Sequence, residues 1–308
     1  MDVDHVHLLE WTTVSPRRMH DDEVDTDGEL VRRLLASQHP QWAELPIERV
    51  RSAGTDNALY RLGDDLAVRL PRIHWAVDKV AKEQQWLPVL APHLPLAVPL
   101  PVAIGEPEEA FPYPWGVVQW LPGTLAALDV LDDPVQAALE LAAFVRSLQS
   151  VDPAGGPAHH RGLPVRLADE AVRRAIAGLR GEVDAAAVTE AWDRAMAAPD
   201  HGDPPVWFHG DLAYLNLLAD GGSITSVIDW GSCGVGDPAI DTIIAWSLFP
   251  PDARRAYRDA LGIDDATWLR GKGWALTGVV GIPYYRHTNA ELVADKIRAI
   301  EAVLADPS

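Results

Sequence analysis

The segment from residue 206 to residue 246 places the strongest constraint on what this chain can fold into. Two short apolar runs, residues 217–219 and 224–228, are separated by Asp220-Gly221-Gly222. Apolar runs joined by such a turn sequence are typical of a β-hairpin. A hairpin brings the residues just before its first strand next to those just after its second strand. We therefore expect the two flanks of this segment to meet in space.

Three polar residues occupy these flanks: Asp211 and Asn216 before the hairpin, and Asp229 after it. Oxygen ligands of this kind can hold Mg²⁺ against nucleotide phosphates, and a further carboxylate can orient an attacking hydroxyl group. We expect Asn216 and Asp229 to share one metal ion and Asp211 to be the catalytic residue. Each residue alone is an ordinary turn residue. The step of five residues from Asp211 to Asn216 is, however, that of the kinase catalytic loop.

These residues lie within a longer pattern: His209-Gly210-Asp211-Leu212, then Asn216, then Val227-Ile228-Asp229-Trp230-Gly231, then Gly236-Asp237-Pro238-Ala239-Ile240-Asp241. The pattern resembles the aminoglycoside phosphotransferase family, which are small-molecule kinases with a fold similar to that of protein kinases. The resemblance extends from about Arg51 to the C-terminus. It implies that His209 and Asp241 support the catalytic loop structurally. Ala213-Tyr214-Leu215 stands where the family often has His-Pro, and Trp230 replaces a phenylalanine.

The order of the expected elements predicts an α+β fold with two lobes, since strands come first and helices later. We expect a polar leader over residues 1–26, a small, mainly β nucleotide-binding lobe over 27–121, and a larger, mainly helical catalytic and substrate-binding lobe over 122–308. The boundary is placed at Pro122-Gly123, which ends a strand. Helices are expected at 27–37, 75–87, 134–150, 166–179, 184–197, 238–249, 251–261, 265–282 and 289–305, with Pro88 ending the second of these.

The nucleotide site is less clearly marked than the catalytic loop. Ser52 and Gly54 lie in a segment between two expected strands, which is the candidate phosphate-covering loop, although a plain turn explains it equally well. The strand that carries a phosphate-binding lysine in kinases has no lysine here. Arg69 is at the matching position, with Glu83 on the next helix as its partner, and Arg72 is the fallback. An arginine supplies charge and a fork of donors, but its geometry differs from that of lysine.

The connection between the lobes would meet the nucleobase, and the resemblance places it at Gln119 to Leu121. The sequence does not distinguish between ATP and GTP as the phosphoryl donor. The acceptor would lie between the catalytic loop and the C-terminal helices. Candidate wall residues there are Trp230, Tyr284, Tyr285 and Glu291, for which the alternative is core packing.

Composition limits the partners. The net charge of −19 disfavours nucleic acid and anionic membranes, and it favours either simple solubility or a cationic small-molecule substrate. Cys233 is the single cysteine, so no disulfide can form within the chain. The first residues do not have the pattern of a signal peptide, and no apolar run is long enough for a membrane span. We expect a cytoplasmic protein, of undetermined oligomeric state.

Several functions stay open. The acceptor is expected to be an antibiotic such as an aminoglycoside, with a macrolide or a metabolite (homoserine, choline or a sugar) as alternatives. A nucleotide-binding pseudokinase that acts as an interaction module is the alternative from another class, and the arginine at position 69 is the one feature in its favour. Residues 234–239 formally match a dinucleotide-binding turn, but the chain before them lacks the α/β repeat which that motif requires.

Overall fold

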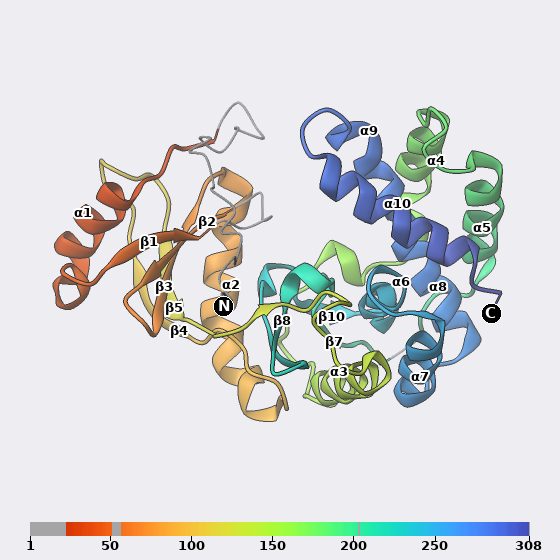
Figure 1. Ribbon diagram of the computed structural model, residues 1–308, viewed down its shortest axis with the longest axis horizontal. Coiled ribbons are helices and arrows are strands. Elements are labelled where there is room, and N and C mark those ends of the chain that lie inside the picture. Colours follow the sequence, from red (N-terminus) through yellow and green to blue (C-terminus); the bar gives the residue numbers. More distant parts are fainter. Residues whose placement is uncertain (1–22, 51–56, 203, 308) are drawn as a thin grey trace, which may run out of the picture.

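The computed structural model describes residues 23–50, 57–202 and 204–307. Its N-terminal part is a five-stranded antiparallel sheet in the order β1-β2-β3-β5-β4. The strands are β1 (Ile47–Val50), β2 (Asn57–Leu62), β3 (Leu66–Pro71), β4 (Pro101–Gly105) and β5 (Trp115–Gln119). Helix α1 (Gly28–Gln38) lies at the outer side of this sheet, and α2 (Val77–Leu90) lies between the sheet and the rest of the molecule (Figure 1).

Local sequence explains these elements. Alternate residues of β2 are buried, because successive side chains of a strand point to opposite faces of the sheet. The expected turn after β2 is present, and Gly63 adopts a φ of 61° there, which favours glycine. At the start of α1 the side chain of Asp27 accepts a hydrogen bond of 2.7 Å from the backbone N–H of Leu30. This cap satisfies one of the donors that a helix leaves open at its start.

The C-terminal part is mainly helical. Its helices are α3 (Pro134–Gln149), α4 (Asp169–Ala177), α5 (Ala185–Ala197), α6 (Ile244–Ser247), α7 (Pro251–Leu261), α8 (Asp265–Leu276), α9 (Gly281–Tyr285) and α10 (Ala290–Leu304). Two small sheets lie within it, β6-β8-β9 and β10-β7. Their strands are β6 (Thr124–Leu125), β7 (Val206–Phe208), β8 (Leu217–Asp220), β9 (Ser223–Val227) and β10 (Gly234–Gly236).

These small strands lie where the N-terminal sheet and the helical part meet (Figure 1). Two hydrophobic cores are present: a small one under the N-terminal sheet and a large one that spans the helical part. The α+β architecture expected from the sequence is confirmed. Placing the lobe boundary between residues 121 and 122 stays a proposal, because the large core also includes Leu87, Leu90 and Val98, which precede that boundary.

The expectation that Pro88 ends the second helix is wrong, because α2 continues through Pro88 to Leu90. Proline within a helix removes one backbone hydrogen bond. Here the extra turn buries Leu90 completely in the large core, next to Leu87. Burial of that side chain offsets the missing bond.

Three other expected helices are shorter or less regular than the sequence suggests. The span 265–282 is broken: α8 ends at Leu276, a 3-10 turn covers Thr277–Val280, and α9 begins at Gly281. Glycine weakens a helix, and Gly278 lies in this break while Gly281 follows it as the first residue of α9. The spans 166–179 and 238–249 both begin with 3-10 turns, Val165–Ala168 and Pro238–Ile243.

The end of the expected polar leader packs onto the N-terminal sheet. Glu23 forms a buried ion pair with Arg72, and the backbone N–H of Val24 donates a hydrogen bond of 2.8 Å to the carbonyl of Arg72. Residues 23–26 therefore belong to the small lobe, which corrects the expected boundary at residue 26. Residues 1–22 lie outside the described part of the chain.

Candidate active site

The loop after β7 is held by a buried carboxylate. The backbone N–H groups of His209 and Gly210 donate hydrogen bonds of 2.8 and 2.7 Å to the two carboxylate oxygens of Asp241. The hydroxyl of Tyr257 donates to the backbone carbonyl of Asp241 at 3.0 Å. Burial raises the pKa of Asp241 to about 7, although the two N–H donors act to lower it. Asp241 therefore fixes the backbone one residue before Asp211.

His209 ties this loop to the β8–β9 hairpin. Its Nε2 lies 3.1 Å from the carbonyl oxygen of Ile228, and its Nδ1 lies 3.2 Å from the backbone nitrogen of Asp211. Gly210 has a φ of 85°, and a Cβ at this position would lie 2.5 Å from the carbonyl oxygen of Ser232. The tight approach explains why glycine precedes Asp211.

The structure brings Asp211 and Asn216 into contact. The side-chain amide of Asn216 donates hydrogen bonds to the backbone carbonyl of Asp211 at 2.8 Å and to its Oδ2 at 3.3 Å. Both donated bonds use the amide nitrogen, so the amide oxygen of Asn216 is directed away from these acceptors. An oxygen of this kind can ligate a metal ion.

Asp229 follows the second strand of the hairpin, as the sequence predicts. The backbone N–H of Ile228 donates to the carbonyl of Asn216 at 2.9 Å, so the two ends of the hairpin meet. Among the described residues other than glycine, Asp229 alone has a positive φ, at 59°. Backbone of this kind is costly and is found preferentially at functional sites. It sets the direction in which the Asp229 side chain leaves the hairpin.

The donor set fits a magnesium ion that is shared with a nucleotide. Within residues 23–50, 57–202 and 204–307, no three His, Cys, Asp or Glu side chains group into a metal site. The protein would supply one carboxylate, from Asp229, and one amide oxygen, from Asn216. Mg²⁺ typically binds one or two carboxylates and takes its other ligands from water and phosphate.

Arg69 on β3 reaches this site from the N-terminal sheet. Its guanidinium forms an ion pair with Glu83 of α2, and its Nη2 lies 3.5 Å from Oδ1 of Asp229. Burial acts to lower the pKa of Arg69, but the charges of Glu83 and Asp229 outweigh it, and the pKa is raised. The fallback residue, Arg72, pairs with Glu23 instead.

A second arginine, which the sequence pattern does not indicate, contacts Asp211 directly. Nη1 of Arg161 lies 2.6 Å from Oδ1 of Asp211 and 2.6 Å from the carbonyl oxygen of Gly210. Burial acts to raise the pKa of Asp211. The charges of Arg161 and His209 and the hydrogen bond from Arg161 outweigh burial, and the pKa is lowered. Asp211 is therefore held as a carboxylate.

Arg161 lies in a 3-10 turn, His160–Gly162, between α3 and α4, 50 residues before Asp211. The turn passes close to the catalytic loop because Gly162 has no side chain: a Cβ there would lie 2.3 Å from the ring of Phe208. A motif of adjacent residues cannot reveal such a contact. The one sequence feature that could have indicated the contact between Arg161 and Asp211 is the glycine that follows Arg161.

The connection between the lobes has one backbone donor left for a nucleobase. The N–H of Gln119 donates to the carbonyl of Leu100 at 2.9 Å, and that of Trp120 to the carbonyl of Asp65 at 2.8 Å. The N–H of Leu121 makes no hydrogen bond to the described residues. Ser52 and Gly54, expected to cover the phosphates, lie outside the described residues.

The expected acceptor-side residues do not form one wall. Trp230 is fully buried, packs against His209 and Phe144, and donates its indole N–H to the carbonyl of Val227 at 3.0 Å. It is a core residue, and its assignment to the substrate site is wrong. Tyr284 and Tyr285 contact each other edge to face on α9, with Tyr284 largely exposed.

Glu291 is exposed in the first turn of α10. On the same helix, Asp295 accepts a hydrogen bond of 2.8 Å from the hydroxyl of Tyr214, a residue of the catalytic loop. This contact joins α10 to the loop that carries Asp211 and Asn216. The acceptor side is therefore bordered by α10.

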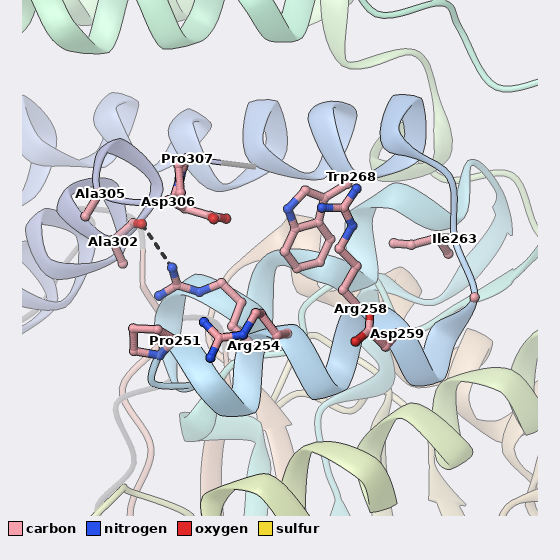
Figure 2. A pocket seen from close by; sticks show the side chains of 12 residues that line it. Pro251, Arg254, Arg258, Asp259, Ile263, Trp268, Ala302, Ala305, Asp306 and Pro307 are labelled. Atoms are coloured by element: carbon pink, nitrogen blue, oxygen red, sulfur yellow. Dashed lines mark hydrogen bonds between the residues drawn. The ribbon is translucent and has the colours of Figure 1, made fainter.

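A pocket of about 800 Å³ lies elsewhere, between α7, α8 and the end of α10 (Figure 2). Arg254, Arg258 and Trp268 line it, and none of the expected site residues does. The guanidinium of Arg254 donates to backbone carbonyls, including that of Ala302 at 3.2 Å. That arginine ties the ends of two helices together, so the pocket is not part of the candidate active site.

Comparison with known proteins identifies the family of this chain. The family model described as the phosphotransferase enzyme family (APH) matches residues 47–274. The chain belongs to this family, and it is a phosphotransferase. The resemblance inferred from the catalytic-loop pattern is confirmed. No curated protein sequence matches the chain.

Solved structures of antibiotic phosphotransferases share the fold. The GDP and kanamycin complex of APH(2″)-IIIa is 21% identical with a TM-score of 0.73, and the match covers 90% of this chain and 99% of that one. Macrolide 2′-phosphotransferase MphH from Brachybacterium faecium is 21% identical with a TM-score of 0.61, with 88% and 97% covered. ADP-bound APH(2″)-Ib is 16% identical with a TM-score of 0.60, with 90% and 98% covered. None of the described helices is long and apolar enough to cross a membrane.

Proposed function

We propose that this protein transfers the γ-phosphoryl group of ATP or GTP to a hydroxyl group of a small molecule. The proposal rests on one observation. Asp211, Asn216 and Asp229 lie together at the ends of one hairpin, and Arg69 reaches Asp229 from β3. These side chains come from both parts of the molecule. Core packing alone does not require them to meet, because it would place apolar side chains there.

Each residue has a distinct role in the transfer. Asp211 accepts a hydrogen bond from the acceptor hydroxyl and takes its proton as the oxygen attacks phosphorus. The new bond joins the acceptor oxygen to the γ-phosphorus, and the bond from that phosphorus to the β–γ bridging oxygen breaks. The nucleoside diphosphate leaves with the electron pair of that bond. Arg69, oriented by Glu83, binds phosphate oxygens and balances their charge.

Asn216 and Asp229 would hold Mg²⁺, which neutralises phosphate charge when it is bound. Within the protein, the hairpin keeps these two residues at a fixed separation. Arg69 contacts Asp229, so the phosphate-binding cation and the metal ligand are positioned together. This arrangement supports a working enzyme over the pseudokinase, because the arginine that replaces lysine is in place.

The solved relatives support a nucleotide as the donor and suggest candidate acceptors. The solved relatives include complexes with GDP and with ADP, so both ATP and GTP are candidate donors. Their printed names describe aminoglycoside and macrolide phosphotransferases. These names support an antibiotic acceptor, with an aminoglycoside first and a macrolide second, and hence a role in resistance. A metabolite kinase, for homoserine, choline or a sugar, would use the same machinery. A nucleotide-dependent role favours the cytoplasm.

The test is mass spectrometry of antibiotics and hydroxylated metabolites incubated with the protein, Mg²⁺ and either ATP or GTP. Asp211→Asn is the matched control, because it keeps the shape of the side chain and removes the base. We expect phosphorylation of at least one acceptor by the wild type. Turnover in the variant should be lower by ~10²-fold or more, the scale of general-base catalysis. Tight nucleotide binding without any phosphorylated acceptor would favour the pseudokinase.

A further inference from the structure

One lysine on the acceptor side has a position that the proposed chemistry does not explain. Lys296 lies on α10, and its side chain runs across Gly278 and Gly281 at the break between α8 and α9. A Cβ at Gly281 would lie 2.5 Å from Cε and 3.3 Å from Nζ of Lys296. The missing side chain at Gly281 therefore makes the room that Lys296 occupies.

The ammonium group of Lys296 has no hydrogen bond or ion pair within the part of the chain that the structure describes. It is partly buried, and burial lowers its pKa, while the charges of Asp211 and Asp295 act to raise it and that of Arg161 to lower it. Lys296 is thus within electrostatic range of the catalytic carboxylate. An ammonium group that is partly withdrawn from water without hydrogen-bond acceptors is costly, and such groups in proteins are usually paired.

The carboxylates that Lys296 faces already have partners. Asp211 pairs with Arg161. Asp295 accepts from the hydroxyl of Tyr214 through Oδ2 and pairs with Arg298 through Oδ1. Neither carboxylate forms a hydrogen bond or an ion pair with Lys296 within the described part of the chain, so the donors of its ammonium group stay available to a ligand.

The positive charge near Asp211 contrasts with the negative charge of the chain as a whole. The protein has a net charge of −19 and few lysines: Lys79, Lys82, Lys272 and Lys296. Of these, Lys79 and Lys296 are both within electrostatic range of Asp211. Exposed charges are screened beyond about 8–10 Å at ordinary salt concentration. A ligand at Asp211 therefore responds to these neighbours more than to the net charge.

The helix that carries Lys296 lies apart from the elements that carry Arg69 and Glu83. Arg69 and Glu83 approach Asp229 from β3 and α2, whereas α10 lies among the C-terminal helices, across the small strands from the N-terminal sheet (Figure 1). Tyr214 of the catalytic loop contacts the same helix. An anion at Lys296 would accordingly belong to the acceptor.

We propose that Lys296 determines specificity by binding an anionic group, a carboxylate or a phosphate, that the acceptor carries close to its reacting hydroxyl. Asp211 receives the hydroxyl while Lys296 holds the anion, so the acceptor is fixed at two points. The proposal rests on the proposed function for the role of Asp211. It changes the order of the candidate acceptors given above: it counts against a polycationic aminoglycoside, which has no group for Lys296 to bind, and favours an acceptor that carries a carboxylate, such as homoserine.

The first experiment measures anion binding without relying on activity. Trace acetylation of the intact protein is followed by peptide mass spectrometry, which reports each of the lysines separately. Four probes share one three-carbon skeleton and are added with MgADP: glycerol 3-phosphate, glycerate, glycerol and 3-aminopropane-1,2-diol. We expect the two anions to slow acetylation of Lys296 in proportion to the occupied fraction of the site, and the neutral and cationic probes to have no effect.

Lys272 is the internal control, because it pairs with Asp306 and lies outside the site. Its acetylation should not respond to any probe. If MgADP or MgATP alone protects Lys296 fully, the cation serves the nucleotide and the proposal is overturned. The same holds if neither anion protects Lys296.

The second experiment uses the acceptor that the mass-spectrometry panel identifies. With an anionic acceptor, Lys296→Met should raise KM roughly ten- to a hundredfold with little change in kcat, the scale of one hydrogen bond to a charged group. Lys296→Arg should recover part of this loss. Gly281→Ala keeps the charge but displaces the end of the side chain, so it should give a smaller rise in KM.

The outcomes separate the two proposals. Protection of Lys296 by the anions without phosphorylation of any acceptor would retain the anion site and reject the kinase function. Efficient phosphorylation of a polycationic or neutral acceptor, with Lys296→Met as active as the wild type, would retain the kinase and reject the anion site.

Discussion

Removing the guanidinium of Arg69 tests the link between the N-terminal sheet and Asp229, the proposed metal ligand. Only 11% of the Arg69 side chain is exposed, and Glu83 beside it is 5% exposed. In Arg69→Ala the carboxylate of Glu83 would stay buried without its cation. Breaking a buried ion pair from one side typically costs about 3–5 kcal/mol of folding stability. Oε1 of Glu83 already has no hydrogen-bond partner among the described residues, so no other contact compensates.

Arg69→Ala should also lower kcat/KM, independently of the loss of folding stability. Losing a preorganised electrostatic stabiliser costs roughly 2–4 kcal/mol of transition-state stabilisation. That is a decrease of about 30- to 1000-fold in kcat/KM, since each ~1.4 kcal/mol is a factor of ten. Arg69→Lys should recover part of it, because lysine keeps the charge but loses the fork of donors.

The assay is a double-mutant cycle of Arg69→Ala and Glu83→Gln, with kcat/KM and urea unfolding measured for each protein. Both quantities should be non-additive, because the two side chains act as one unit. The double variant should be more stable than additivity predicts, since no buried charge is left unpaired. Additive effects, or an Arg69→Ala enzyme as active as the wild type, would refute the reasoning.

Arg72→Ala is the matched control. Arg72 also forms an ion pair with a buried glutamate, but its partner is Glu23, and it makes no contact with Asp229 among the contacts of the described residues. We expect a similar loss of stability and little change in kcat/KM. A large catalytic loss in this variant would move the phosphate-binding role to Arg72.

Three further results should follow from the site. Nucleotide should raise the melting temperature more with Mg²⁺ than with EDTA, because ligand binding stabilises the folded state; Asp229→Ala should abolish this difference, and a surviving difference would place the metal elsewhere. Arg161→Met should move the acidic limb of the pH–kcat profile to higher pH, because Arg161 lowers the pKa of Asp211, the group that must be ionised; an unmoved limb would exclude this role. Asp241→Asn should cost about 1–3 kcal/mol in urea unfolding, because an amide offers one acceptor oxygen to two N–H donors; wild-type stability would contradict this.

The parts of the site that the sequence predicts are those encoded locally. Asp211, Asn216 and Asp229 lie on or beside one hairpin, and a turn sequence is enough to bring its ends together. Arg69 and Glu83 follow from a strand and the next helix, which are neighbours in the chain. Local geometry predicts their positions because few residues separate them.

The parts that the sequence does not predict depend on packing between distant segments. Arg161 reaches Asp211 from a turn whose path is set by contact with Phe208. Trp230 follows the metal ligand directly, yet its ring turns into the core and donates to a backbone carbonyl. Helix α2 continues through Pro88 because the large core receives Leu90. In each case tertiary burial decides against the local preference.

Contacts from α2 connect the position of the N-terminal sheet to the loop that carries Asp229, the proposed metal ligand. Lys82 donates to the carbonyls of Gly231 at 3.0 Å and Cys233 at 3.3 Å, so α2 holds the loop that follows Asp229. Glu83, the next residue on the same helix, holds Arg69 against Asp229. A shift of α2 would therefore move the loop and the phosphate-binding cation together. Asp229 and Arg69 therefore keep their relative geometry only while α2 keeps its position between the two parts of the molecule.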